Sequence, residues 1–96
     1  MFIRKRIKRR NKIIDALAMT LGNKNLIVIK GGNGYIMCGY LDLKAAEKAK
    51  DTAVKITGVS TIEQALRTRV CSCTSTAKKL GIYKGQTIKK VLGIIS

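Results

Sequence analysis

The stretch of residues 26–41, LIVIKGGNGYIMCGYL, constrains the fold more than any other part of this sequence. Two apolar runs rich in β-branched residues, 26–30 and 35–41, flank GGNG at 31–34, where glycine and asparagine readily adopt positive φ. Such runs separated by a short glycine-rich turn are typical of a β-hairpin. The sequence therefore predicts two antiparallel strands, with Gly39 marking a bulge or a close backbone approach in the second.

The segment before this hairpin is less decisive. Arg10-Asn11 can form a turn, because asparagine tolerates a left-handed backbone. Residues 13–21, IIDALAMTL, fit one face of a helix, and they equally fit a strand that is apolar on both sides. Both alternatives stay open, and GNKN at 22–25 is expected to break whichever element forms.

The remainder of the chain alternates between helical and extended patterns. Asp42 can cap a first helix, and Ser60 with Glu63 has the S-x-x-E spacing of a capping box. The expected elements are a helix at 43–50, a strand at 52–59, a helix at 61–68, a strand at 69–73, a helix after Thr74 or Ser75 that ends at Gly81 with a Schellman contact, and a last helix that ends at Gly93.

This order predicts an α+β fold, in which N-terminal antiparallel strands precede an αβαβα succession. We expect one mixed sheet with the helices packed on it. The chain has no proline and no Ser/Gly-rich linker, so residues 13–96 are expected to form a single domain.

Positive charge is concentrated at the start of the chain. The 20 Lys and Arg residues against 5 Asp and Glu give a formal charge of +15. Residues 1–12 are expected to form a basic N-terminal arm, and their cations are Arg4, Lys5, Arg6, Lys8, Arg9, Arg10 and Lys12. A charge of this size destabilises the folded state by self-repulsion unless an anionic partner neutralises it. The alternative is that the charge serves only solubility. We expect an RNA partner, with ribosomal RNA as the target of a ribosomal or ribosome-associated protein.

The expected contacts are with the RNA backbone. Guanidinium groups bind phosphate oxygens in pairs, whereas the sequence offers few aromatic rings on which bases can stack. A second set of candidate RNA contacts lies near the C-terminal end and comprises Lys78, Lys79, Lys84, Lys89 and Lys90.

Little in the sequence indicates catalysis. Histidine is absent, and three cysteines, Cys38, Cys71 and Cys73, are too few for a zinc site of their own. The odd number of cysteines points to free thiols in a reducing, cytoplasmic setting. The phosphate-binding patterns GxxxxGK(S/T) and GxGxxG are both absent. The acidic residues form no evident pair. We expect no catalytic residue, cofactor or metal, and no membrane partner, since no apolar run approaches ~20 residues.

Three stretches carry a resemblance to a known family: GYIMCGYLD at 34–42, GVSTIEQAL at 58–66 and TSTAKKLGIYKGQT at 74–87. They resemble the YunC-like proteins, a small α+β family of undefined function in bacteria and archaea. The resemblance covers roughly residues 12–96. It implies the fold, and it implies no activity.

Two other functions stay open at this point. The glycine-rich hairpin and Cys38 could serve a small-molecule binder or an enzyme. The chain could also be a homo-oligomeric scaffold that pairs through a sheet edge and uses its charge for solubility.

Overall fold

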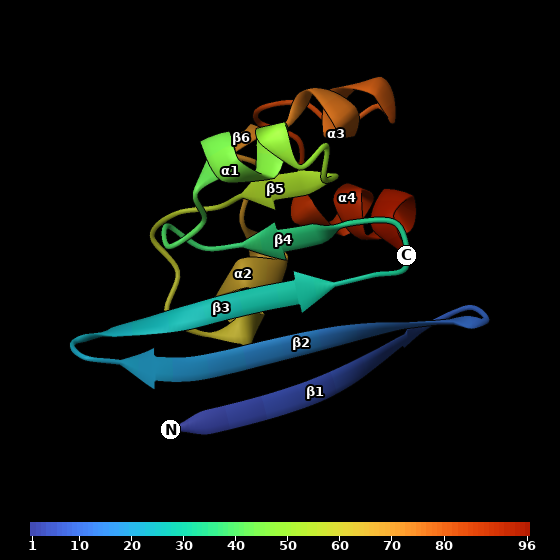
Figure 1. Ribbon diagram of the computed structural model, residues 1–96. Coiled ribbons are helices and arrows are strands. Elements are labelled where there is room, and N and C mark those ends of the chain that lie inside the picture. The colour runs from blue at the N-terminus through green and yellow to red at the C-terminus, as the bar shows by residue number, and fades with distance from the viewer.

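The fold is built on one mixed sheet of six strands, shown in Figure 1 for the computed structural model of residues 1–96. The strands lie side by side in chain order, and only the neighbours β4 and β5 run parallel. The strands are β1 (Phe2–Arg9), β2 (Lys12–Leu21), β3 (Lys24–Lys30), β4 (Tyr35–Met37), β5 (Ala53–Lys55) and β6 (Ser72–Cys73), and the helices are α1 (Leu43–Lys48), α2 (Ile62–Arg67), α3 (Ser75–Lys79) and α4 (Ile88–Ile95). The α+β class is therefore confirmed, and so is the αβαβα order after β4, which α4 follows as a sixth element.

The basic segment at the start is a strand of the sheet. We expected residues 1–12 to form an arm outside a domain at 13–96, but β1 pairs antiparallel with β2 along its whole length. The two strands meet at a turn where Arg10 has a φ of 57°, so the turn falls where the sequence placed it. The pairing satisfies the edge of β2, and Ile7 packs against the main core. Residues 2–9 thus belong to the domain.

The residues that fitted either a helix or a strand form β2. Ile14, Ala16 and Ala18 alternate as its buried side chains. The alternation gives β2 one core face, as in a half-buried antiparallel strand.

Two glycines of the β3–β4 hairpin are required because neighbouring atoms leave no room for a Cβ. A Cβ on Gly31 would lie 2.2 Å from the carbonyl oxygen of Ile95, and one on Gly34 would lie 2.7 Å from the Thr52 side chain. Neither glycine has a positive φ. Gly39 lies beyond the end of β4 at Met37, so it marks no bulge within a strand.

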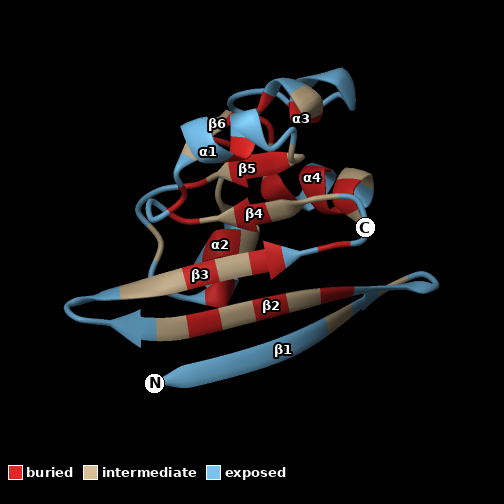
Figure 2. Cartoon of the chain, in the orientation of Figure 1, coloured by how far each residue is buried: buried red, intermediate tan, exposed pale blue.

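The main core lies between one face of the sheet and the helices α2 and α4, and Ala77 of α3 belongs to the same cluster. Ile14, Ile29 and Ile36 of the sheet pack in one cluster with Ile62 of α2 and Val91 of α4. A small second cluster lies on the opposite face. It joins Leu41, just before α1, and Ala46, within α1, to Ala53 of β5. Figure 2 shows that burial is concentrated in the middle of the sheet, whereas β1 is exposed along most of its length.

The helix caps agree with the sequence at most positions. Asp42 caps α1 by accepting from the Lys44 and Ala45 amides, and Thr74 caps α3. Gly81, with a φ of 95°, ends α3 while the Ile82 amide donates back to the Ala77 carbonyl in the expected Schellman arrangement.

Two helix boundaries differ from those expected. The cap of α2 is Thr61, which accepts from the Gln64 amide, while the Gln64 side chain accepts from the Ser60 amide. The predicted Ser60–Glu63 box was therefore wrong by one residue. The final helix α4 also continues past Gly93, because Ile95 is buried against the core.

Candidate nucleic-acid interface

The sheet has a face that no helix covers over β1, β2 and β3. Residues paired across antiparallel strands lie on the same face. The register aligns Arg4 with Leu17 and Val28, and Arg6 with Asp15 and Lys30. We call this surface the open face, and its strand residues at β1–β3 include Phe2, Arg4, Arg6, Lys8, Ile13, Asp15, Leu17, Met19, Val28 and Lys30.

Cations line this face along the outermost strand. Arg4, Arg6 and Lys8 stand at alternate positions of β1, all exposed to solvent. With a rise of about 3.3 Å per residue, they are spaced roughly 7 Å apart. Lys30 adds a further exposed cation from β3. The strand geometry thus converts the sequence run of cations into a row on one surface.

Asp15 is the carboxylate within this row. Its Oδ1 lies 3.6 Å from Arg4 Nη2 and 3.7 Å from Arg6 Nε, and the atom accepts no hydrogen bond. These contacts are long for charge-assisted hydrogen bonds. The guanidinium groups therefore keep their donors available to another anion.

The other cations of residues 1–12 have different surroundings. Lys5 points to the helix side of the sheet and binds Glu63 of α2, and the hydrogen bond from Lys5 lowers the pKa of that carboxyl. Arg9 lies against Gly93 of α4. A shallow hollow of about 430 Å³ at this corner is lined by Arg9, Arg10, Asn11, Lys12, Gly93 and Ser96.

The second predicted set of cations does not join the open face. Lys78 and Lys79 lie on α3, next to the opposite edge of the sheet from β1 in Figure 1. Lys89 and Lys90 belong to α4, which packs on the covered face, and Lys84 lies in the connection between α3 and α4. The structure therefore separates Lys78 and Lys79 from the cations of β1.

Sequence reasoning missed Lys30 and Asp15 as residues of the open face. Lys30 is the last residue of the predicted 26–30 strand, and Asp15 lies in the 13–21 segment that fitted either a helix or a strand. Their place beside Arg6 depends on the register of two strand pairs, and no local pattern records that register.

The cysteines are built into the fold. The buried Cys38 sulfur accepts from the Ile27 amide at 3.4 Å and donates to the Asn25 carbonyl at 3.9 Å. Cys73 is buried as well, and that burial raises the pKa of its thiol. Cys71 is partly exposed. The structure brings together no group of three or more His, Cys, Asp and Glu side chains.

The glycine-rich hairpin and Cys38 do not form one site. The 31–34 turn precedes β4 and packs against the C-terminal residues, whereas Cys38 follows the other end of β4. The turn and the thiol therefore lie at opposite ends of β4. None of the helices is both long enough and apolar enough to span a bilayer.

The fold and the open face define a small α+β protein with one mixed sheet and a basic edge strand. The chain belongs to the family described as domain of unknown function DUF1805, which matches residues 37–94. It is 35% identical over 81 residues to the uncharacterized protein YunC of Bacillus subtilis, covering 80% of each chain. The resemblance to YunC-like proteins is thereby confirmed.

A solved structure shares the whole fold. The crystal structure of TA1206, a protein of unknown function from Thermoplasma acidophilum, superposes with a TM-score of 0.95 at 33% identity. The match covers 100% of this chain and 94% of that one, so it includes the β1 edge strand. The family match begins at residue 37, hence the basic row lies outside it.

Proposed function

We propose that this protein binds RNA through the open face and the β1 edge, contacting phosphates with Arg4, Arg6, Lys8 and Lys30. The observation that carries the proposal is the regular row of exposed cations on β1, beside a single carboxylate. A polyanion gains from such a row because each phosphate contact releases condensed counterions. Ribosomal RNA in the cytoplasm is the proposed target, as the sequence suggested.

The side chains on the open face favour contacts with the RNA backbone rather than with its bases. Phe2 is its exposed aromatic residue, at 64% exposure. Tyr35, on the same side of the sheet, donates its hydroxyl to Asp51 at 2.8 Å and is half-buried. One ring cannot hold successive bases as the stacking platforms of RNA-recognition sheets do. The proposed binding therefore depends on phosphate positions and RNA shape.

Charge also weighs against assembly of two copies through this edge. An exposed edge strand offers unpaired backbone groups to a second strand. Pairing β1 with a second β1 would bring Arg4, Arg6 and Lys8 of both copies together. Like charges on paired strands are destabilising, so the cations disfavour this edge as a homo-oligomer contact.

The proposal is tested by comparing two triple variants that lose the same charge. Arg4→Gln/Arg6→Gln/Lys8→Gln removes the row, and Lys78→Gln/Lys79→Gln/Lys84→Gln removes three cations outside the open face. We expect the first variant to bind a fluorescein-labelled ribosomal RNA hairpin at least tenfold more weakly at 100 mM salt, measured by anisotropy. The second should bind within about threefold of the unmodified protein. Equal losses would contradict the proposal, because binding would then follow net charge alone.

Substitution is the sharper test than truncation here. Removing residues 1–11 would delete a strand and uncover the edge of β2, in addition to removing cations. Glutamine substitutions keep the β1–β2 backbone pairing, and far-ultraviolet circular dichroism checks that the fold is retained.

A further inference from the structure

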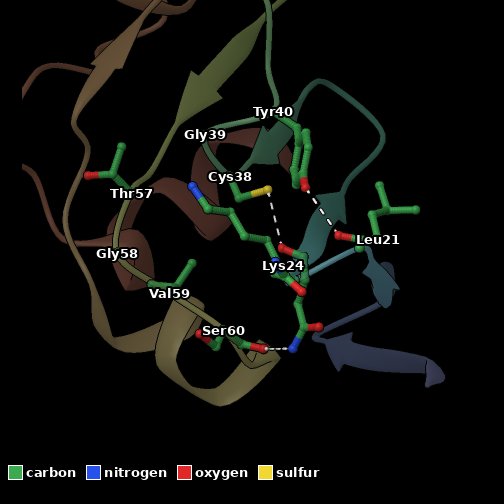
Figure 3. A pocket seen from close by; sticks show the side chains of 12 residues that line it. Leu21, Lys24, Cys38, Gly39, Tyr40, Thr57, Gly58, Val59 and Ser60 are labelled. Atoms are coloured by element: carbon green, nitrogen blue, oxygen red, sulfur yellow. Dashed lines mark hydrogen bonds between the residues drawn. The ribbon is translucent and has the colours of Figure 1, made fainter.

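A groove lies at the ends of β4 and β5, away from the glycine-rich hairpin. The two strands are parallel, so the loops that follow them, 38–40 and 57–60, leave the sheet side by side. The β2–β3 turn at 21–25 forms the third wall of a cavity of about 910 Å³, shown in Figure 3. Small-molecule sites in sheets with parallel strands commonly occupy this position, outside the carboxyl ends of the strands.

The two loops present backbone donors that the protein leaves unused. Within the sheet, the Cys38 amide donates to Ile27 and the Ile56 amide to Met37. Beyond these, five amides that line or flank the groove donate no hydrogen bond to any protein acceptor: those of Gly39, Tyr40, Thr57, Gly58 and Val59. Successive backbone amides without a protein acceptor can bind an anion where they line a hollow.

The charges around the groove have the matching sign. Lys24 is its charged lining residue, and no carboxylate lines it. In Figure 3 the Lys24 side chain reaches across the groove and ends between Cys38 and Thr57. Its ammonium makes no ion pair with any acidic side chain of the protein. A cation without a partner therefore stands beside free amide donors.

Gly39 has no structural reason to be glycine. Its φ is not positive, and a Cβ built there meets no atom within 4 Å. At Gly31 and Gly34, by contrast, close packing leaves no room for a Cβ, so glycine is required. A glycine that neither conformation nor packing requires, at the wall of a groove, allows a ligand to approach the backbone closely.

We propose that this groove binds a small molecule bearing a phosphate group. The phosphate would accept from the free amides of the 38–40 and 57–60 loops, and the Lys24 ammonium would balance its charge. The exposed ring of Tyr40 borders the same space and offers an apolar surface to the remainder of the ligand. This site is independent of the proposed RNA interface, because none of its lining residues belongs to the β1 row.

The direct test is a titration of the 15N-labelled protein followed by amide chemical shifts. Glycerol 3-phosphate is the probe, glycerol the uncharged match, and inorganic phosphate the minimal anion. We expect saturable shifts at Gly39, Tyr40, Gly58 and Val59 with glycerol 3-phosphate, smaller effects with inorganic phosphate and none with glycerol. Absence of saturable shifts with either anion up to 20 mM, roughly a hundred times the protein concentration, would overturn the proposal.

Two variants separate the groove from general charge. Lys24→Gln should weaken binding of glycerol 3-phosphate at least fivefold. Lys79→Gln, an equal charge change on α3, should leave the affinity for this ester unchanged. Gly39→Ala should retain the thermal midpoint, since its Cβ meets no protein atom, and yet weaken binding. Equal effects of Lys24→Gln and Lys79→Gln would contradict the site.

The source of the phosphate is decided by competition. A short single-stranded RNA is added to the protein saturated with glycerol 3-phosphate. If the RNA displaces the ester and shifts the same amides, the groove is part of the RNA surface and the small-molecule proposal is wrong. We expect the Arg4→Gln/Arg6→Gln/Lys8→Gln protein to bind the ester normally, whether or not it has lost RNA binding.

Discussion

Lys5 Nζ donates a hydrogen bond to Glu63 Oε1 at 2.6 Å, which joins the edge strand β1 to helix α2 across 58 positions of sequence. The contact uses a cation on the covered side of β1. Arg4 and Arg6, on the opposite side, make only long contacts to Asp15. Alternation along one strand thus assigns neighbouring cations to different tasks, one to anchoring the strand and the others to the open face.

The Lys5–Glu63 contact should make stability depend on acid pH. The hydrogen bond from Lys5 lowers the pKa of Glu63 below its ordinary 4.5 in the folded protein. A carboxyl with a lowered folded pKa contributes stability above pH 4.5, and this contribution is lost as pH falls through the folded pKa. Lys5→Met should therefore make the urea midpoint less dependent on pH between 6 and 3. An unchanged pH profile would contradict the assigned contact.

The close packing of Gly31 predicts a sharp contrast between adjacent residues. Gly31→Ala places a Cβ 2.2 Å from the Ile95 carbonyl oxygen, whereas Gly32→Ala meets only Ser96 C at 3.9 Å. Overpacking against backbone should lower the free energy of unfolding by about 1–3 kcal/mol in Gly31→Ala. Gly32→Ala should stay within about 0.5 kcal/mol of the unmodified protein. Urea denaturation checks both, and equal values would show that the turn does not contact the C-terminal residues.

Tyr35 predicts a loss of stability at alkaline pH. Burial, with the hydrogen bond to Asp51, raises the pKa of its phenol to about 12. Because the folded pKa exceeds the ordinary 10, the contribution is complete below pH 10 and is lost as pH rises from 10 to 12. Tyr35→Phe should cost about 1 kcal/mol at pH 7 through the lost hydrogen bond. It should also lose less stability than the unmodified protein between pH 10 and 12, measured under reducing conditions; parallel profiles would argue against the raised pKa.

Much of the fold was predictable because its signals are local. The 26–41 hairpin, the Asp42 and Thr74 caps and the Gly81 terminus each depend on a few adjacent residues. The edge strand β1 was not predictable in this way, because its apolar residues are sparse and its partner strand fitted a helix equally well. The Ser60 box failed for a related reason: Thr61 and Gln64 repeat the pattern one residue later, and Glu63 is engaged by the distant Lys5.

The candidate site was predictable in composition and not in geometry. The cations of residues 4–12 were evident, and so was the scarcity of aromatic rings. The antiparallel register determines which of these cations share a face of the sheet. The same register places Lys30 and Asp15 on that face. The separation of Lys78 and Lys79 from β1 likewise depends on the order of strands across the sheet.

Asp15 provides a gain-of-binding prediction. Its carboxylate lies among Arg4, Arg6 and Lys30 and would repel an approaching phosphate. Asp15→Asn should therefore tighten RNA binding by about two- to tenfold at 100 mM salt, because the negative charge that repels phosphate beside the row is removed. Asp42→Asn, an equal charge change at the α1 cap, is the control and should have less than a twofold effect. Weaker binding by Asp15→Asn in anisotropy measurements would contradict the placement of the interface.

The salt dependence of RNA affinity tests the central claim most directly. If the unmodified protein neutralises about four phosphates, with Arg4, Arg6, Lys8 and Lys30, the logarithm of its association constant should fall with the logarithm of salt concentration at a slope of about −3. Arg4→Gln/Arg6→Gln/Lys8→Gln should make the slope shallower by about 2, and Lys78→Gln/Lys79→Gln/Lys84→Gln by less than about 0.5. A shared slope for the two variants, or no RNA binding by the unmodified protein at 50 mM salt, would contradict an RNA interface on β1.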